Sequence, residues 1–137
     1  MTYRLDEQVG YILRLAHQRA ASVFQEVMAS SQLTPTQFSA LVRLSEHGET
    51  SQNRLGRLTG MDPATIQGVI RRLAKRELIE FRHDPDDRRR RLWRLSAAGE
   101  KLIGGMIRLG PDVSSAVLAP LTHDEQRVFL TLLKRLT

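Results

Sequence analysis

One charged stretch, HDPDDRRRRLWRL at residues 83–95, holds the side chains of this sequence that are best suited to chemistry. Its histidine and aspartates could ligate a metal, and its arginines could bind a polyanion. Four consecutive arginines would oppose a cation and compete for the carboxylates, and the spacing lacks the glycine and terminal glutamate of a calcium loop. We therefore expect neither a metal nor another cofactor. A polyanion site and a solvated charge run remain as alternatives.

The composition favours a polyanionic partner. In 137 residues there are 21 Lys and Arg against 15 Asp and Glu, a net charge of +6, and only three of the basic residues are lysines. Arginine forks match phosphates and base edges better than ammonium groups do. Nucleic acid is therefore the first candidate partner, with an anionic membrane second.

Several classes of protein are disfavoured. The chain has no cysteine, which excludes disulfides, thiolate metal ligands and a cysteine nucleophile. No apolar run approaches the roughly 18–20 residues of a membrane span, and no signal peptide is seen, so we expect a cytoplasmic protein without a membrane role. The four histidines are scattered and no phosphate loop or nucleophile elbow occurs, so we expect no enzyme.

Apolar spacing predicts the helices that would position the charged stretch. A long amphipathic helix is expected over residues 6–29. The next should begin at a capping box formed by Thr34 and Gln37. Its expected inner face is Phe38, Leu41, Val42 and Ser45. Two shorter helices should follow, at about 52–58 and from the Asp62 cap to about 77. The expected buried stripe of the second is Ile66, Val69, Ile70 and Leu73.

A β-hairpin is expected directly after these helices. The short β-type runs at 78–81 and 92–95 flank the charged turn. A helix-turn-helix followed by a charged hairpin predicts a winged helix. A long helix capped by Ser96 should then bend or break near 110, and a last helix should start at the capping box Thr122–Glu125. That helix is expected to bury Val128, Phe129, Leu132, Leu133 and Leu136.

This order of elements resembles the MarR family of transcriptional regulators. The resemblance is carried by residues 33–99 and most of all by Asp84-Pro85-Asp86-Asp87-Arg88-Arg89, followed by a strand and Leu95-Ser96-Ala97-Ala98-Gly99. The family usually has threonine where Ser96 stands, which keeps the hydroxyl cap. The resemblance implies a mainly α fold with a small β-hairpin in one domain, residues 1–137. A winged helix-turn-helix core would cover about 33–96, and dimerisation helices would cover 1–30 and 97–137.

The resemblance also implies a function. We expect a homodimer that represses transcription at a palindromic operator in double-stranded DNA and is released by a small ligand or an oxidant. Thiol-based oxidant sensing is excluded because there is no cysteine. The stretch DPATIQGVI is similar to regulators of aromatic-acid catabolism, so an aromatic carboxylate is the expected effector. A winged helix for a protein or RNA partner, and a small hydrolase using the wing carboxylates, are the alternatives.

The expected DNA contacts lie on the outward face of the second short helix and on the wing. Gln67 could bind adenine, Arg71 guanine, and Ala64 or the Thr65 methyl a thymine methyl. Gly68 weakens a helix by about 1 kcal/mol relative to alanine, which favours a close backbone approach to DNA. The full expected set is Ser51, Gln52, Asn53, Ala64, Thr65, Gln67, Gly68, Arg71, Arg72, Arg88, Arg89 and Arg90.

Two further roles are expected. Asp87 should brace an arginine at the base of the wing, so that Arg89 or Arg90 projects into the minor groove. His17 lies on an apolar helical stripe, either as a dimer-interface histidine or as an effector contact with Arg14 nearby. The expected effector-binding set is Arg14, His17, Phe24 and Phe38.

Overall fold

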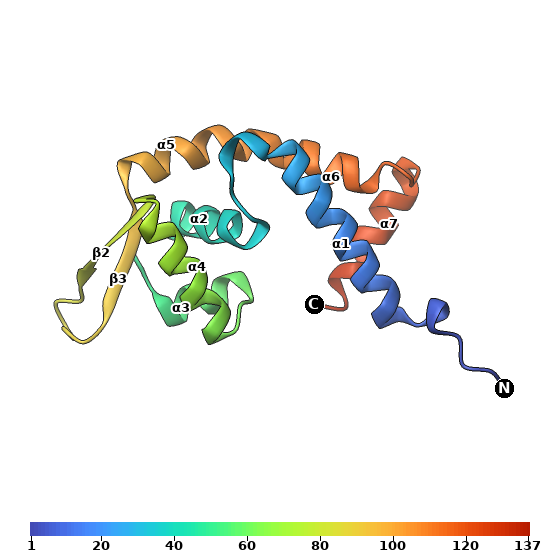
Figure 1. The fold of residues 1–137 in the computed structure, drawn as a ribbon, viewed down its shortest axis with the longest axis horizontal. Helices are drawn as coiled ribbons and strands as arrows, with labels where there is room; N and C mark the ends of the chain where they lie inside the picture. Colours follow the sequence, from blue (N-terminus) through green and yellow to red (C-terminus); the bar gives the residue numbers. More distant parts are fainter. The chain divides into compact units, whose positions relative to one another are not determined.

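The computed structural model describes all 137 residues and is mainly helical with one small sheet (Figure 1). The chain forms two compact units: a central unit, Met28–Arg108, and a terminal unit, Met1–Val27 with Leu109–Thr137. The first helix after the wing is part of the central unit, and its Ile103 belongs to that unit's hydrophobic core; the expected role of residues 97–137 in dimerisation stays a prediction.

The central unit holds the helix-turn-helix and the wing. Its helices are η2 (Ala29–Ser31), α2 (Pro35–His47), α3 (Gln52–Thr59), α4 (Pro63–Lys75) and α5 (Ala97–Met106). The expected capping box is confirmed, since Thr34 accepts from the Gln37 amide and Gln37 accepts from the Thr34 amide. Asp62 caps α4 by accepting from the Thr65 amide at 2.8 Å.

Within the helix-turn-helix, the buried stripe agrees with the prediction on α4 but not fully on α2. Ile66, Val69, Ile70 and Leu73 of α4 are all buried, as expected. On α2 the deepest residues are Ala40, Leu41 and Leu44, while Ser45 is exposed. The expectation for Ser45 is therefore wrong. The buried face of α2 is turned toward Ala40 and Leu44 because α3, α4 and α5 all contact this helix.

The sheet has three antiparallel strands in the order β1-β3-β2. Strands β2 (Ile79–His83) and β3 (Arg91–Leu95) form the expected hairpin, which we call the wing together with its connecting turn. Strand β1 (Thr50–Ser51) was not expected; it pairs Thr50 with Trp93 along the free side of β3. The buried ring of Trp93 joins the core cluster and fixes the wing to the helices.

The terminal unit contains η1 (Leu5–Glu7), α1 (Val9–Val27), α6 (Gly110–Leu118) and α7 (His123–Lys134). The expected break near 110 is confirmed as a 3-10 turn, η3 (Ile107–Leu109), between α5 and α6. Arg19 ties α1 to α6 by donating to the carbonyls of Ala116 and Val117. The Thr122–Glu125 capping box of α7 is confirmed.

The expected burial on α7 is wrong for a single chain. Val128, Phe129 and Leu132 of α7, together with Leu136 just after it, are 40–68% exposed, and Leu133 is half-buried. These residues form an apolar face, but no element of the same chain covers it. No single helix of the chain is both long and apolar enough to cross a membrane; only the bent pair Ala97–Leu118 and His123–Lys134 meets those limits together.

Candidate nucleic-acid interface

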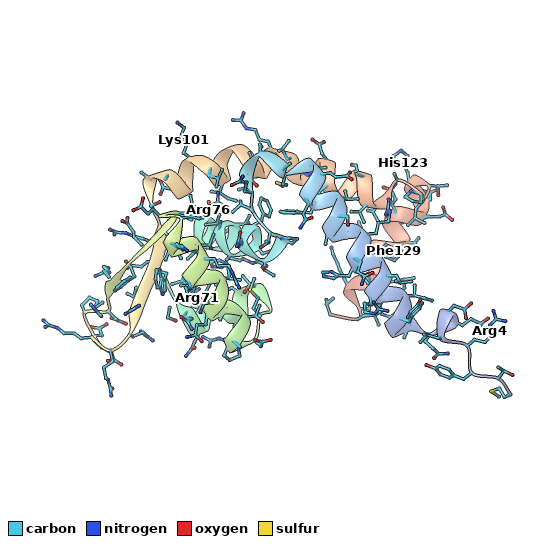
Figure 2. The ribbon with its side chains drawn as sticks, viewed as in Figure 1. Arg4, Arg71, Arg76, Lys101, His123 and Phe129 are labelled. Carbon is cyan, nitrogen blue, oxygen red and sulfur yellow. The ribbon has the colours of Figure 1, made fainter.

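The outward face of α4 is polar and exposed. Ala64, Thr65, Gln67, Arg71 and Arg72 are exposed on the side of the helix opposite its buried stripe. Figure 2 shows Arg71 on this helix. Because neither arginine forms an ion pair within the chain, both guanidinium groups keep their donors for an outside acceptor. This face therefore has the donor and acceptor types that read base edges.

Gly68 is half-buried on the same face. A Cβ added there would approach only the flexible end of Arg72, 3.0 Å from its Nη1. No rigid part of the fold requires a glycine at this position. The expectation that Gly68 admits a close outside partner remains a prediction.

The first turn of α3 and the wing arginines line one hollow. It measures about 320 Å³ and is bordered by Ser51, Gln52, Asn53, Arg89, Arg90, Arg91 and Trp93. We call it the wing hollow. Ser51 also caps α3 by accepting from the Arg54 amide at 3.3 Å. Residues 51–53 and 89–90, two parts of the expected DNA-binding set, thus lie together although about 40 residues separate them in the sequence. Arginine side chains beside the amides of a helix N-terminus favour an anion.

Arg91 borders this hollow but was not among the expected DNA-binding residues. Its guanidinium lies over the Phe81 ring, 4.3 Å from the centroid, and His83 meets the same ring edge-on. The register pairs Phe81 with Trp93 and His83 with Arg91, so all four side chains share one face of the sheet. The period-two alternation along 91–93 was the signal that could have placed Arg91 beside Trp93.

The brace at the base of the wing is Asp84. Its carboxylate accepts from the Asp86 amide at 2.9 Å, from Arg90 Nε at 3.0 Å and from Arg90 Nη2. The Asp84 amide in turn donates to the Arg90 carbonyl and closes the turn. Asp84 is buried, and the Asp86 amide followed by the Arg90 guanidinium holds the pKa of its carboxyl below the ordinary value.

Asp87, the residue expected to brace the wing, is half-buried in the turn, and its bracing role stays a prediction. It does hold an arginine, accepting from the Arg89 amide at 3.1 Å and from Arg89 Nε at 3.3 Å. The Arg89 side chain is 92% exposed, and Arg88 forms no ion pair. Arg88 and Arg89 therefore point outward from the wing, whereas Asp84 holds the side chain of Arg90.

The expected effector residues are divided between the two units. Arg14, His17 and Phe24 lie on α1 of the terminal unit, and Phe38 lies on α2 of the central unit. Arg14 stacks on the Tyr11 ring at 5.3 Å, His17 is exposed and Phe24 is buried. The effector site made from these residues stays a prediction.

Known proteins share both the sequence and the fold. Residues 33–90 match the model of the MarR family. NicR of Pseudomonas putida, an HTH-type transcriptional repressor, is 38% identical over 134 residues, which cover 98% of this chain and 85% of NicR. The family match includes the wing motif and lies within the central unit, whereas the NicR match extends over both units.

Two solved structures agree over nearly the whole chain. A probable transcriptional regulator from Pseudomonas aeruginosa is 50% identical with a TM-score of 0.92, covering 98% of this chain and 100% of its own. BpsR of Bordetella bronchiseptica, whose DNA binding is regulated by 6-hydroxynicotinic acid, is 34% identical with a TM-score of 0.91, covering 99% and 97%. The winged helix-turn-helix expected from the resemblance is thus confirmed, and the chain belongs to the MarR family of transcriptional regulators.

Proposed function

We propose that this MarR-family regulator represses transcription by binding a palindromic operator as a homodimer, and that a small aromatic carboxylate releases it. The observation that carries the DNA contact is the wing hollow, where the first turn of α3 meets three consecutive arginines. Its positive charge suits a backbone phosphate held between the helix-turn-helix and the wing. The alternative protein- or RNA-binding module would not need this arrangement beside an exposed polar α4.

Each part of the interface has a distinct role in the proposal. The exposed face of α4 enters the major groove, with Gln67 and Arg71 reading bases and Ala64 and Thr65 contacting thymine methyl groups. Arg88 and Arg89 reach the adjacent minor groove, where a narrow groove concentrates negative potential. Asn53, Arg90 and Arg91 position the phosphate backbone, which fixes the register but carries no sequence information.

The homodimer rests on the uncovered apolar face of the terminal unit. A groove of about 570 Å³ runs between α1 and α7, and its apolar lining is Val9, Ile12, Leu13, Phe129, Leu132, Leu133 and Leu136. We call it the terminal groove. A large exposed apolar surface on a folded chain marks an association site. A second copy placing the same surface against it would form the self-complementary interface of a two-fold dimer.

The repression and effector parts of the proposal draw on the relatives. NicR is a repressor, and BpsR responds to 6-hydroxynicotinic acid, an aromatic ring with a carboxylate. In this chain the α1 side chains Arg14 and His17 would bind the carboxylate, and Phe24 would contact the ring. Half-sites lie about 34 Å apart, so a shift of a few ångströms between two recognition helices would break their register on DNA.

The test is a duplex selection followed by affinity measurement. We expect selection from random duplexes to return a palindrome, bound at least about a thousandfold more tightly than random DNA, with affinity falling as salt rises. A panel of aromatic acids should weaken operator binding, and operator DNA should weaken acid binding by the same factor. Binding to RNA or protein with no sequence-selective duplex binding would instead support the alternative module.

A further inference from the structure

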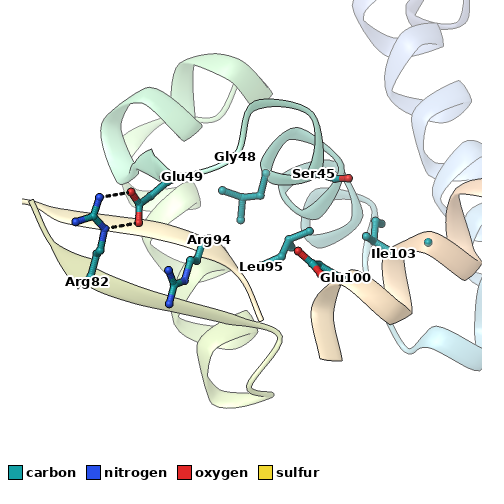
Figure 3. A pocket seen from close by; sticks show the side chains of 10 residues that line it. Ser45, Gly48, Glu49, Arg82, Arg94, Leu95, Glu100 and Ile103 are labelled. Atoms are coloured by element: carbon teal, nitrogen blue, oxygen red, sulfur yellow. Dashed lines mark hydrogen bonds and ion pairs between the residues drawn. The ribbon is translucent and has the colours of Figure 1, made fainter. Parts of the chain in front are cut away.

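An open hollow of about 750 Å³ lies on the surface of the central unit, on the side of the wing that carries Arg82 and Arg94 (Figure 3). Its wall comes from α2, the loop after it, β2, β3 and α5. We call it the α2–α5 hollow. It is separate from the residues that border the wing hollow and from the expected effector set. Its volume is within the range of small-molecule sites, about 300–1,000 Å³.

The α2–α5 hollow combines an apolar floor with a charged rim. The buried side chains of Leu44 and Ile103, with half-buried Leu95, provide the floor. On the rim, Figure 3 shows Arg94 between the Glu49–Arg82 ion pair and Leu95, with Glu100 on the side toward Ile103. A few polar groups above an apolar surface are what orients a small ligand.

The rim groups differ in how much bonding capacity they retain. Arg82 is held by Glu49 through two hydrogen bonds of 2.7 Å. Arg94 gives only its Nε to Glu80, at 3.3 Å, and its two terminal nitrogens have no acceptor in the chain. Glu100 forms no ion pair. A free guanidinium edge and a free carboxylate therefore face the same hollow.

Two glycines keep the walls of the hollow open. A Cβ added at Gly48 or at Gly104 would meet nothing within 4 Å. Gly48 has φ of +71°, which requires a glycine at the end of α2 whatever the space. Gly104 lies inside α5, where glycine weakens a helix by about 1 kcal/mol relative to alanine. The need for an open wall would explain why α5 has a glycine at this position.

We propose that the α2–α5 hollow is a ligand site for a small carboxylic acid with an apolar body and a hydrogen-bond donor at the far end. The carboxylate accepts from the free terminal nitrogens of Arg94, because a charged guanidinium fork is the strongest hydrogen-bond donor on the rim. The apolar body covers Leu44, Leu95 and Ile103. The donor, a hydroxyl or ring N–H, bonds to Glu100.

A ligand bound in the α2–α5 hollow would affect how the wing is held. Glu49 and Arg82 border the hollow and also connect β2 to the loop that precedes α3. A carboxylate bound at Arg94 repels the Glu49 carboxylate and competes with it for Arg82. The hydrogen bond from Arg82 lowers the pKa of Glu49, so Glu49 is the charged group that this carboxylate meets. The ligand site thus contacts the same ion pair that holds the wing to the helix-turn-helix. The site itself does not depend on the proposed effector role of Arg14 and His17.

The test uses the full chain, 4-hydroxybenzoate as the probe and amide chemical shifts as the readout. We expect saturable shifts at Gly48, Leu95 and Gly104, with a dissociation constant below about 1 mM. The uncharged 4-hydroxybenzamide should bind at least about tenfold more weakly, as the charge-assisted bond to Arg94 is lost. Arg94→Gln should weaken the binding of 4-hydroxybenzoate by a similar factor.

A steric variant separates the hollow from any other site. Gly104→Phe places a ring in the open space of the wall and should abolish these shifts, while Gly105→Phe, next in the same helix and also without neighbours within 4 Å, should leave them unchanged. Shifts confined to α1, no saturation by about 5 mM, or equal loss in both variants would overturn the proposal.

The same variants distinguish this site from the proposed effector response. If wild type releases operator DNA with the acid but shows no shift at Gly48 or Gly104, the hollow is not a site and the proposed function stands. If Gly104→Phe loses the shifts yet still releases DNA, the hollow binds ligand independently of that response. If shifts occur at the hollow without any DNA release, the ligand site is supported and the effector proposal fails.

Discussion

Arg71 and Arg89 are both exposed arginines of the central unit, but they lie on different kinds of backbone. Arg71 projects from a rigid helix that is fixed by four buried side chains. Arg89 projects from the tip of a turn, with Asp87 as its only ion-pair partner. A side chain on a fixed helix can discriminate base edges, while one on a turn is better suited to the shape and charge of the backbone.

This difference leads to a first prediction. Arg71→Ala should cost about 1–3 kcal/mol per half-site on the operator and relax its specificity, with little change on random DNA. Arg89→Ala should weaken both duplexes and reduce the slope of log K against log salt by up to about 2 in a dimer. The measurement is fluorescence anisotropy with operator and random duplex across a salt series. Unchanged slopes and affinities for Arg89→Ala would reduce the wing to a solvated charge run.

A second prediction concerns Arg91 and the ring beneath it. Arg91→Ala should flatten the salt dependence by about 0.9 per half-site if this arginine contacts phosphate. Phe81→Leu keeps every charge but removes the cation–π contact, worth about 0.5–1 kcal/mol at exposed sites, so affinity should fall about two- to fivefold with the slope nearly unchanged. Lys101→Ala, at an exposed position of α5, is the charge-matched control. Identical salt slopes for Arg91→Ala and wild type would remove Arg91 from the interface.

A third prediction concerns pH. The pKa of Asp84 is lowered in the folded chain, so its contribution is complete above the ordinary aspartate pKa of about 3.9 and is lost as pH falls through the lower folded value. The wing signals in an amide spectrum should therefore persist down to about pH 4. Asp84→Asn removes the charge at neutral pH and should broaden the signals of 85–90 and weaken DNA binding about tenfold. Asp86→Asn, whose carboxylate forms no ion pair, is the control; equal effects of both changes would contradict the brace.

At the scale of elements, α5 is attached to the wing by a very close contact at Gly99. A Cβ there would fall on the Leu78 carbonyl oxygen, which is backbone and cannot move aside. Next to it, Ser96 caps α5 by accepting from the Gly99 amide, donates its hydroxyl to the Glu77 carbonyl, and donates its amide to the Leu78 carbonyl. The end of the wing and the start of α5 are thus built as one joint.

The fourth prediction contrasts two glycines of the same helix. Gly99→Ala should destabilise the chain by about 1–3 kcal/mol or more, because overpacking against backbone outweighs the gain in helix propensity. Gly104→Ala has open space and should stabilise by about 0.5–1 kcal/mol. Urea unfolding followed by circular dichroism measures both free energies of unfolding. A stabilised Gly99→Ala would show that the joint can open without loss.

The sequence predicted helices and caps better than it predicted where charges and short strands lie. Periodic apolar residues and hydroxyl caps are local signals, so α4, the Thr34 cap and the Thr122 cap agree with expectation. Strand β1 has only two residues and exists through pairing with distant Trp93, which no local pattern shows. The choice of Asp84 over Asp87 as the buried brace depends on how the turn closes on Arg90, a tertiary contact among neighbouring like residues.

At the scale of the whole molecule, the two units differ in how complete they are. The central unit has a closed core that includes Leu41, Leu55, Leu73 and Trp93. The terminal unit leaves large apolar side chains exposed on both α1 and α7. In the proposed dimer a second copy would cover these side chains, so dimerisation and the fold of the terminal unit should be coupled.

The fifth prediction tests that coupling. We expect a stable dimer at micromolar concentration, with an interface above roughly 2,000 Å². Leu132→Glu should shift the protein toward monomer by placing charge on the terminal groove, and it should weaken operator binding because two half-sites are no longer linked. Sedimentation velocity measures the mass, and Thr131→Glu on the same exposed helix is the control. A stable wild-type monomer would contradict both the dimer and the palindrome.

Strand β2 is an edge of the sheet, since it pairs with β3 alone. A bare edge can add a strand from another molecule and so begin ordered aggregates. Here that edge carries Glu80, Arg82 and His83 in succession around one exposed aromatic, and Asp84-Pro85 ends it at once. Alternating charge and a proline are the means by which natural sheets resist such addition. The charged side chains that form the ion pairs of the wing also keep the sheet of one molecule from pairing with the sheet of the next. A concentrated solution of this protein should therefore stay free of fibrils.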